Sequence, residues 1–205
     1  MSDLAIVGRS SSHFTRVARV FALELGVPHD FRPILDMTSL EADTYAGNPA
    51  LKMPVLVLPE GPLFGTENIC RELARRSPEG SRAVLRGQVP DRLVANAEEL
   101  ALHAMSADVL LVLAAIAGDG QASPKVRAGL ENSLRFLDEN LEAVLSALPP
   151  ARLVSFFEVA TFSLVMHLRF RKLADIGDHG RLAAFAARFS GRESARCTEF
   201  RFDSV

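Results

Sequence analysis

The 205-residue sequence lacks tryptophan and contains a single tyrosine, Tyr45, and two cysteines, Cys70 and Cys197. The cysteines do not have the spacing of a zinc site, and both fall in helical patterns, so we expect buried or semi-exposed thiols. No group of histidine, aspartate and glutamate residues has metal-ligand spacing, and no glycine-rich nucleotide loop occurs. The sequence therefore predicts neither a metal site nor a nucleotide site.

The sequence also lacks a strong net charge. The formal net charge is −2, which gives no electrostatic reason to expect nucleic acid or an anionic membrane as a partner. The apolar run Val109–Ile116 is far shorter than the roughly 20 residues that cross a bilayer. The N-terminus shows no basic segment followed by an apolar one, so no secretory signal is expected. We predict a soluble, cytoplasmic protein.

The first 47 residues show the periods of strands and helices in alternation. Leu4–Val7 is a short continuous apolar run, typical of a buried parallel strand. Phe31–Ile34 fits a second strand at a sheet edge, because Pro33 cannot donate a ladder hydrogen bond. Asp36–Gly47 is polar and predicts a loop with a short helical piece. Between the two strands an apolar stripe predicts an amphipathic helix that Gly26 ends: Phe14, Val17, Phe21 and Leu25.

A hairpin and a helix follow in Asn48–Leu73. The apolar run Val55–Leu58 predicts a strand, and proline and glycine in the next four residues predict a turn into a second strand. Thr66 stands where the N-cap of the following helix is expected. Pro54 opens the first strand, a position where proline is tolerated, and the Met53–Pro54 bond is a candidate cis peptide.

After a stretch rich in proline, glycine and serine, Ser77–Pro90, the period becomes helical throughout. Asp91–Ala117 predicts one long helix, and Pro124 sits at the start of the next. That next helix carries an apolar seam at alternating spacings of four and three, typical of packing in a helical bundle: Leu130, Leu134, Leu137, Leu141, Val144 and Leu148. Ser155-x-x-Glu158 has the form of a capping box, in which each residue satisfies a free backbone N–H, and it opens an apolar helix over Val159–Phe170.

Read together, Ser11–Gly26 and Asn48–Leu73 resemble the thioredoxin-like N-terminal half of cytosolic glutathione S-transferases. The capping box and the segment His179–Arg196 resemble that family's core helix and its penultimate helix and tail. The resemblance implies an α/β thioredoxin-like domain over residues 1–77, a linker over 78–90 and an all-α helical-bundle domain over 91–205. It also implies glutathione as a co-substrate, a small electrophilic or hydrophobic second substrate, and a homodimer.

The N-terminal motif resembles the serine-type motif of bacterial members, S-P-[FY]-x-R-x-x-R, and here reads S-H-F-T-R-V-A-R from Ser12. In that family a donor at this turn stabilises the thiolate of glutathione, which is the nucleophile. The resemblance makes Ser12 the candidate catalytic residue, with Ser10 and Ser11 as alternative donors; the other reading is that Ser12 only caps the helix. His13, in place of the usual proline, either polarises the site or is solvated.

The glutathione-binding residues also follow from the resemblance. Lys52 matches the position that meets the glycyl carboxylate, and Met53, before the structural cis-Pro54, would pair its backbone with the cysteinyl part. Thr66 matches the hydroxyl that binds the γ-glutamyl carboxylate at a helix N-terminus. Gly65 departs from the family pattern, because an acidic residue is usual there. Glu67 would replace that carboxylate only if the start of the helix shifted.

The second substrate would lie against the long helix, where four residues are candidates to line its pocket, although such a stripe is also typical of a core: Leu102, His103, Met105 and Ser106. Two functions remain open. One is a glutathione transferase with Ser12 as the thiolate-stabilising residue. The alternative is a non-catalytic, glutathione-transferase-like binding or assembly module, for which the missing acidic residue at Gly65 would be typical.

Overall fold

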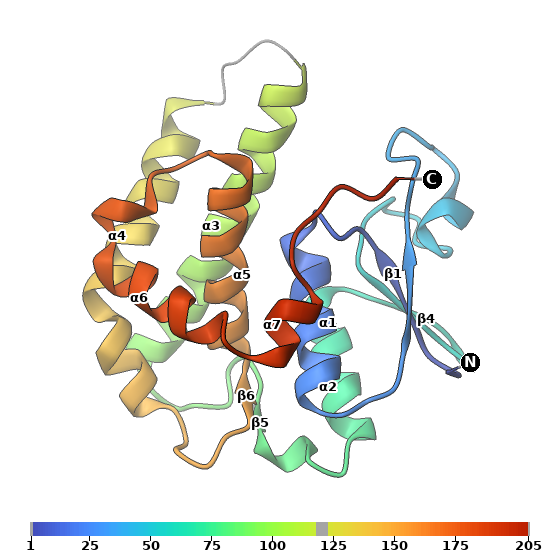
Figure 1. The fold of residues 1–205 in the computed structure, drawn as a ribbon, viewed down its shortest axis with the longest axis horizontal. Coiled ribbons are helices and arrows are strands. Elements are labelled where there is room, and N and C mark those ends of the chain that lie inside the picture. The colour runs from blue at the N-terminus through green and yellow to red at the C-terminus, as the bar shows by residue number, and fades with distance from the viewer. Residues whose placement is uncertain (1, 118–122, 205) are drawn as a thin grey trace.

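The computed structural model describes residues 2–117 and 123–204, with a sheet-containing half and a helical half side by side (Figure 1). The elements of the first half are β1 (Ala5–Gly8), α1 (His13–Glu24), β2 (Asp30–Pro33), the 3-10 helix η1 (Ala42–Tyr45), β3 (Val55–Leu58), β4 (Gly61–Phe64) and α2 (Thr66–Arg76). Helices α1 and α2 lie between the sheet and the helical half. This is the predicted thioredoxin-like arrangement of helices on a mixed sheet.

The sheet has the strand order β2-β1-β3-β4. Strand β1 runs parallel to β2 and antiparallel to β3, and β3 and β4 form the predicted hairpin. Strand β1 is buried along its whole length, as its continuous apolar run predicts. Strand β2 lies at the edge, which confirms the interpretation of Pro33.

The helical half packs around two long antiparallel helices (Figure 1). Its elements are η2 (Gly80–Arg82), β5 (Ala83–Val84), α3 (Arg92–Ala117), α4 (Pro124–Ala147), β6 (Val154–Ser155), α5 (Phe156–Arg171), η3 (Ile176–Asp178), α6 (Gly180–Phe189) and α7 (Glu193–Cys197). Helix α3 packs against α4 and α5, and α6 packs against the same two helices. Helix α7 packs against α1 of the first half.

The helix predictions that rest on periodicity are confirmed. Helix α1 ends at Glu24, and Gly26 follows with a φ of +63°, the left-handed conformation that favours glycine after a helix. Helix α4 begins at Pro124, as predicted. All six residues of its seam are buried: Leu130, Leu134, Leu137, Leu141, Val144 and Leu148.

The segment expected to be a linker contains structure that the sequence analysis missed. Strand β5 pairs in parallel with β6, and the backbone N–H of Leu153 donates to the carbonyl of Arg82 at 2.8 Å. Ala83 and Val84 are both buried. A strand of two residues is too short to show a period of its own, so only the fold reveals it.

Helix α3 is more apolar than the short run Val109–Ile116 suggested. Among the described residues it is the one helix that is long and apolar enough, by length and composition, to cross a membrane, with a mean hydropathy of 2.1 in its most apolar window. A core helix of a soluble protein passes the same test. Helix α3 packs against α4 and α5, and 28% of its most apolar window is buried. Its last turns leave Leu110, Leu113 and Ile116 exposed.

The capping box at Ser155 is formed only in one direction. The Ser155 hydroxyl accepts from the backbone N–H of Glu158 at 3.2 Å, as predicted. The carboxylate of Glu158 does not return to the Ser155 backbone; it accepts from the Ser155 hydroxyl at 2.7 Å and from two guanidinium nitrogens of Arg152 at 2.8 and 3.0 Å. The reciprocal bond is therefore a wrong prediction. Glu158 instead binds the turn that precedes β6, where Arg152 also holds the carbonyls of Leu148 and Pro149.

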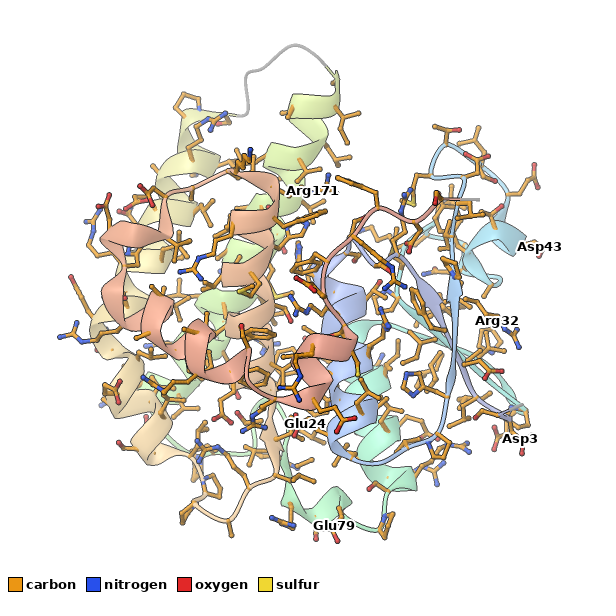
Figure 2. All side chains as sticks on the ribbon, in the orientation of Figure 1. Asp3, Glu24, Arg32, Asp43, Glu79 and Arg171 are labelled. Atoms are coloured by element: carbon orange, nitrogen blue, oxygen red, sulfur yellow. The ribbon has the colours of Figure 1, made fainter. Side chains whose placement is uncertain are left out.

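One hydrophobic cluster runs through both halves of the molecule. The rings of Phe21 in α1 and Phe156 in α5 lie 6.4 Å apart, in the middle of this cluster. At the end of α1, which Figure 2 labels at Glu24, the Glu24 carboxylate accepts from Arg192 at 3.0 Å and from the Ser194 hydroxyl. The two halves are thus joined by shared apolar burial and by a polar contact at its rim.

Candidate functional site

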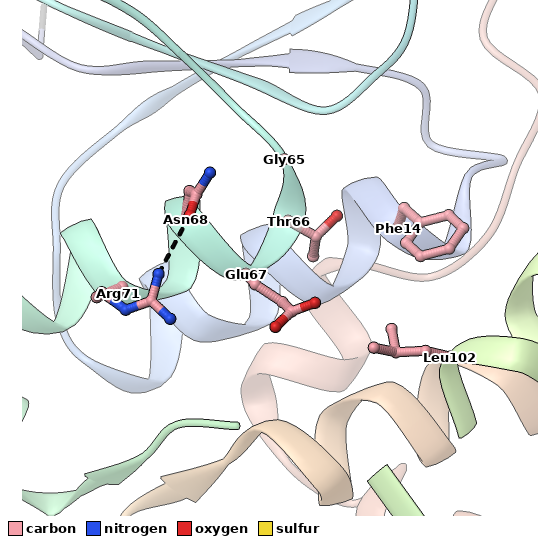
Figure 3. A pocket seen from close by; sticks show the side chains of 7 residues that line it. All are labelled: Phe14, Gly65, Thr66, Glu67, Asn68, Arg71 and Leu102. Carbon is pink, nitrogen blue, oxygen red and sulfur yellow. Dashed lines mark hydrogen bonds between the residues drawn. The ribbon is translucent and has the colours of Figure 1, made fainter. Parts of the chain in front are cut away.

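A cavity of about 310 Å³ lies beside the N-terminus of α2, where the two halves meet. Figure 3 shows Thr66 and Glu67 of α2 facing Phe14 of α1 and Leu102 of α3. The residues that line the cavity are Phe14, Gly65, Thr66, Glu67, Asn68, Arg71 and Leu102. Sequence analysis did not propose Asn68 or Arg71, although their spacing of three on α2 places them on one face of the helix.

The start of α2 differs by one residue from the prediction. The N-cap is Gly65, with a φ of +87°, and Thr66 is the first residue of the helix. The first backbone N–H groups of a helix lack intrahelical partners and favour an anion. Because residues with a Cβ are strained at this φ, an acidic side chain cannot be introduced at Gly65 without a cost in stability. Thr66 is half-buried at the cavity wall.

The carboxylate of Glu67 does not simply replace the acidic residue missing at Gly65. The helix start shifts by one residue toward the N-terminus, and both oxygens of Glu67 accept from the Arg86 guanidinium at 3.3 Å. Arg86 also pairs with Glu99 on α3. Glu67 is therefore engaged in an ion-pair group that joins α2 to the helical half, while its side chain still forms part of the cavity wall.

Ser12 is the N-cap of α1. Its hydroxyl oxygen accepts from the backbone N–H of Thr15 at 3.2 Å, so the structural role considered for it is present. In this bond the hydroxyl acts only as an acceptor, which leaves its own proton for another partner. Ser10 and Ser11, the alternative donors, are only 2% and 5% exposed, whereas Ser12 is half-buried. Of the three serines, Ser12 is the accessible one.

The two arginines of the N-terminal motif serve packing. The guanidinium of Arg16 lies between the rings of Phe162 and Phe200, at 4.6 and 4.4 Å, and donates to the Ala195 carbonyl at 2.9 Å. Burial lowers the pKa of Arg16 to about 10, so it remains a cation at neutral pH. Arg19 lies over the ring of Phe31 at 4.0 Å. Through these contacts the two arginines of the motif hold α1 against its neighbours.

The segment before β3 is a loop that ends in the predicted cis-proline. The Met53–Pro54 peptide bond is cis. The side-chain amide of Asn48 donates to the Lys52 carbonyl at 2.8 Å and so fixes the loop from within. The Lys52 side chain is exposed, Met53 is half-buried and Pro54 is buried. These positions leave the Lys52 ammonium group accessible to a ligand.

The four residues proposed to line one second-substrate pocket do not share a surface. Leu102 lines the cavity at α2. Met105 is fully buried in the core, and its carbonyl lies 3.1 Å from His13 Nε2. His103 and Ser106 line a separate, mostly apolar groove between α3 and α4. A helix with apolar residues on every face gives no sequence signal that separates these positions.

His13 is not solvated, as the sequence analysis considered it to be, but is 2% exposed. Burial holds its pKa well below the usual range, with the neighbouring His167 acting in the same direction, so the ring is neutral. The fold brings His13 (α1), Asp108 (α3) and His167 (α5) together, with a ligand atom of each within 4.8 Å of the others. This group could not be predicted from the sequence, because its members lie far apart in the chain.

Comparison with known families identifies the first half. Residues 7–81 match the family described as "Glutathione S-transferase, N-terminal domain". A search of curated proteins finds no relative that matches the sequence.

Solved structures of the same fold cover the whole chain. A glutathione S-transferase from Methylobacillus flagellatus with GSH bound has 24% identity and a TM-score of 0.79, over 97% of this chain and 100% of that one. One from Methylobacterium radiotolerans, in complex with glutathione sulfonate, has 20% identity and a TM-score of 0.77, over 100% and 98%. A family member from Pseudomonas fluorescens with bound glutathione has 21% identity and a TM-score of 0.77, over 97% and 99%. At these identities the likeness establishes the fold.

Proposed function

We propose that this chain is a catalytically active member of the glutathione S-transferase family, whose N-terminal domain model it matches, and that it binds glutathione beside α2. In this proposal it activates the thiol for attack on a small electrophilic or hydrophobic substrate, and it acts as a cytoplasmic homodimer. The observation that carries the proposal is Ser12, accessible at the N-terminus of α1 with an uncommitted hydroxyl proton. Glutathione bound in the related structures supports the choice of ligand.

The binding mode follows from the chemistry of the cavity. The γ-glutamyl carboxylate would accept from the Thr66 hydroxyl and from free backbone N–H groups at the start of α2. The backbone of Met53 would pair with the cysteinyl part, and the exposed Lys52 ammonium group would meet the glycyl carboxylate. Phe14 and Leu102 line the same cavity, and we assign the space between them to the second substrate.

The thiol of this ligand would lie at the N-terminus of α1. A hydrogen bond donated by the Ser12 hydroxyl stabilises the thiolate more than the thiol and so lowers the pKa of the thiol. The partial positive charge at the start of α1 acts in the same direction. The thiol proton passes to the solvent and the more nucleophilic thiolate attacks a carbon of the electrophile. The new carbon–sulfur bond replaces the bond to a leaving group, which departs with its electrons, or a double bond that takes up the electrons and a proton, and the product is a thioether of glutathione.

Calorimetric titration of the purified protein with reduced glutathione is the first test of this function. We expect binding in the micromolar to low-millimolar range, followed by conjugation of general electrophiles. The glycine at position 65 specifically favours the alternative function, a non-catalytic module, because no carboxylate there meets the ligand's ammonium group. A folded protein that gives no heat at millimolar glutathione would exclude the transferase and support the module.

Thr66→Val is expected to weaken glutathione binding about 10- to 150-fold, because a hydrogen bond to a carboxylate contributes roughly 1.5–3 kcal/mol. Valine has nearly the shape of threonine, so the cavity wall is conserved. The dissociation constant from the same calorimetric titration measures the change. Thr66→Ser, which retains the hydroxyl, serves as the control and should bind like the parent protein. Equal affinity of all three proteins would remove Thr66 from the ligand site.

A further inference from the structure

We propose that His13, Asp108 and His167 form a binding site for one divalent transition-metal ion of the zinc class, at the junction of α1, α3 and α5. Each residue offers one ligand atom, and these atoms lie within 4.8 Å of one another. All three side chains are buried, with exposures of 2%, 0% and 3%. The proposal is independent of glutathione chemistry, because the ligands come from side chains assigned no part in it.

The two imidazole rings have the orientation that metal-binding histidines adopt. His13 Nε2 lies 3.1 Å from the carbonyl of Met105, and His167 Nε2 lies 3.0 Å from the carbonyl of Ser11. A carbonyl can only accept, so each Nε2 carries the hydrogen and each Nδ1 faces Asp108. A backbone carbonyl holding the remote N–H is the usual second-shell partner of a metal-bound histidine.

The distances around Asp108 suit a small metal ion. His13 Nδ1 lies 3.5 Å from Asp108 Oδ2. Ligands at about 2.0–2.2 Å from a tetrahedral zinc ion are about 3.3–3.6 Å apart. His167 Nδ1 is closer to the same oxygen, at 2.5 Å, the length of a short hydrogen bond. An entering ion would take the place of the proton in that bond, and the proton would pass to the solvent.

Two buried polar atoms in this group have no hydrogen-bond partner among the described residues: His13 Nδ1 and Asp108 Oδ1. Such atoms are uncommon in folded proteins and call for an unseen partner. Here both belong to the same three-residue group, and both are acceptors, so the partner they require is a cation or a donor. A cation satisfies both atoms at once and is also matched by the Asp108 charge.

The donor set selects the class of metal. Two imidazole nitrogens and one carboxylate suit zinc and its neighbours, whereas magnesium and calcium prefer oxygen ligands only. The guanidinium of Arg171 lies near, with Nε 3.4 Å from His167 Nε2, and its charge opposes the ion. That repulsion favours a moderate affinity, measurable by titration, over permanent retention of the metal.

The test uses the full chain without a histidine tag, treated with a chelator and titrated with Co²⁺ and Zn²⁺. We expect one equivalent of either ion to bind, visible d–d absorption from Co²⁺ bound by nitrogen, and loss of that absorption when Zn²⁺ is added. Zn²⁺ titrations in buffers of different ionisation enthalpy should show release of about one proton, since the ion replaces the proton between His167 and Asp108.

His13→Pro is the decisive variant. Position 13 is the first residue of α1, where proline is tolerated, and Ser12 has the extended backbone that must precede a proline (φ −102°, ψ 122°). The variant should therefore fold while it loses one ligand, and it should bind Zn²⁺ at least about 10-fold more weakly. His103→Gln, which removes an exposed histidine of α3, is the matched control and should bind like the parent.

Asp108→Asn provides a second route, because asparagine keeps the shape but lacks the charge. The proposal is overturned if the folded parent binds no ion at 100-fold excess over protein, or if His13→Pro binds as tightly as the parent. It is also overturned if His103→Gln abolishes binding, since the ion would then lie on the surface. Circular dichroism of every variant establishes that each loss of binding is measured on folded protein.

Discussion

Replacing Ser12 by alanine is expected to lower kcat for glutathione conjugation by about 100-fold, the typical cost of removing one preorganised donor to a developing or stabilised anion. Glutathione affinity should change little, because the other contacts of the ligand are made by the α2 end of the cavity. The pKa of the bound thiol should rise, since the donor that favours the thiolate is gone. Steady-state kinetics and the ultraviolet absorbance of the bound thiolate measure the two effects separately.

The alanine variant also removes the N-cap of α1, which costs about 1 kcal/mol of stability. Two further variants separate this loss of stability from the loss of catalysis. Ser12→Asp retains an N-cap but offers no hydroxyl proton and places a negative charge beside the sulfur, so it should be stable and inactive. Ser12→Thr retains both functions and should keep most of the activity. If Ser12→Asp conjugates glutathione as fast as the parent, Ser12 is a cap and nothing more.

The second large effect concerns folding. Glu158→Ala is expected to reduce the free energy of unfolding by about 2–4 kcal/mol, because it leaves the mostly buried Arg152 without its bidentate partner and removes the acceptor of the Ser155 hydroxyl. Arg152 keeps its hydrogen bonds to the carbonyls of Leu148 and Pro149 in this variant, which is why the range extends down to about 2 kcal/mol. Urea unfolding followed by circular dichroism measures the change.

Glu158→Asp tests which bond matters at this position. Aspartate keeps the charge, and it can still accept from the Ser155 hydroxyl. Its shorter side chain cannot reach Arg152 in the same bidentate geometry, so a loss of about 1–2 kcal/mol is expected. A variant as stable as the parent would show that the ion pair with Arg152 contributes nothing net.

The parts of the molecule that could be predicted from sequence are those governed by local periodicity. The seam of α4 and the end of α1 at Gly26 depend on spacings of three and four residues and on the conformational freedom of one glycine. Ser12 and Thr66 were predicted because each lies at a helix start within a short motif. The placement of Thr66 failed by one residue, since the positive φ of Gly65 cannot be inferred from its identity alone.

The parts that could not be predicted depend on contacts between distant residues. Asp108 lies in an apolar stretch of α3, and His167 follows it by 59 residues. Because α3 is apolar on nearly every face, its sequence does not say which side meets α1 and α5. The same ambiguity placed Met105 in the pocket, when its side chain belongs to the core. Only the packing of three helices decides these positions.

The hydrophobic cluster that runs through both halves makes the chain one cooperative unfolding unit. Neither half could retain its share of that cluster if the other opened, so the backbone amides of α1 and α5 should exchange with solvent only when the whole chain unfolds. Native-state hydrogen exchange would then give one common opening free energy for both helices. The short strands β5 and β6 pair at the connection between the halves, so the connection should unfold together with them.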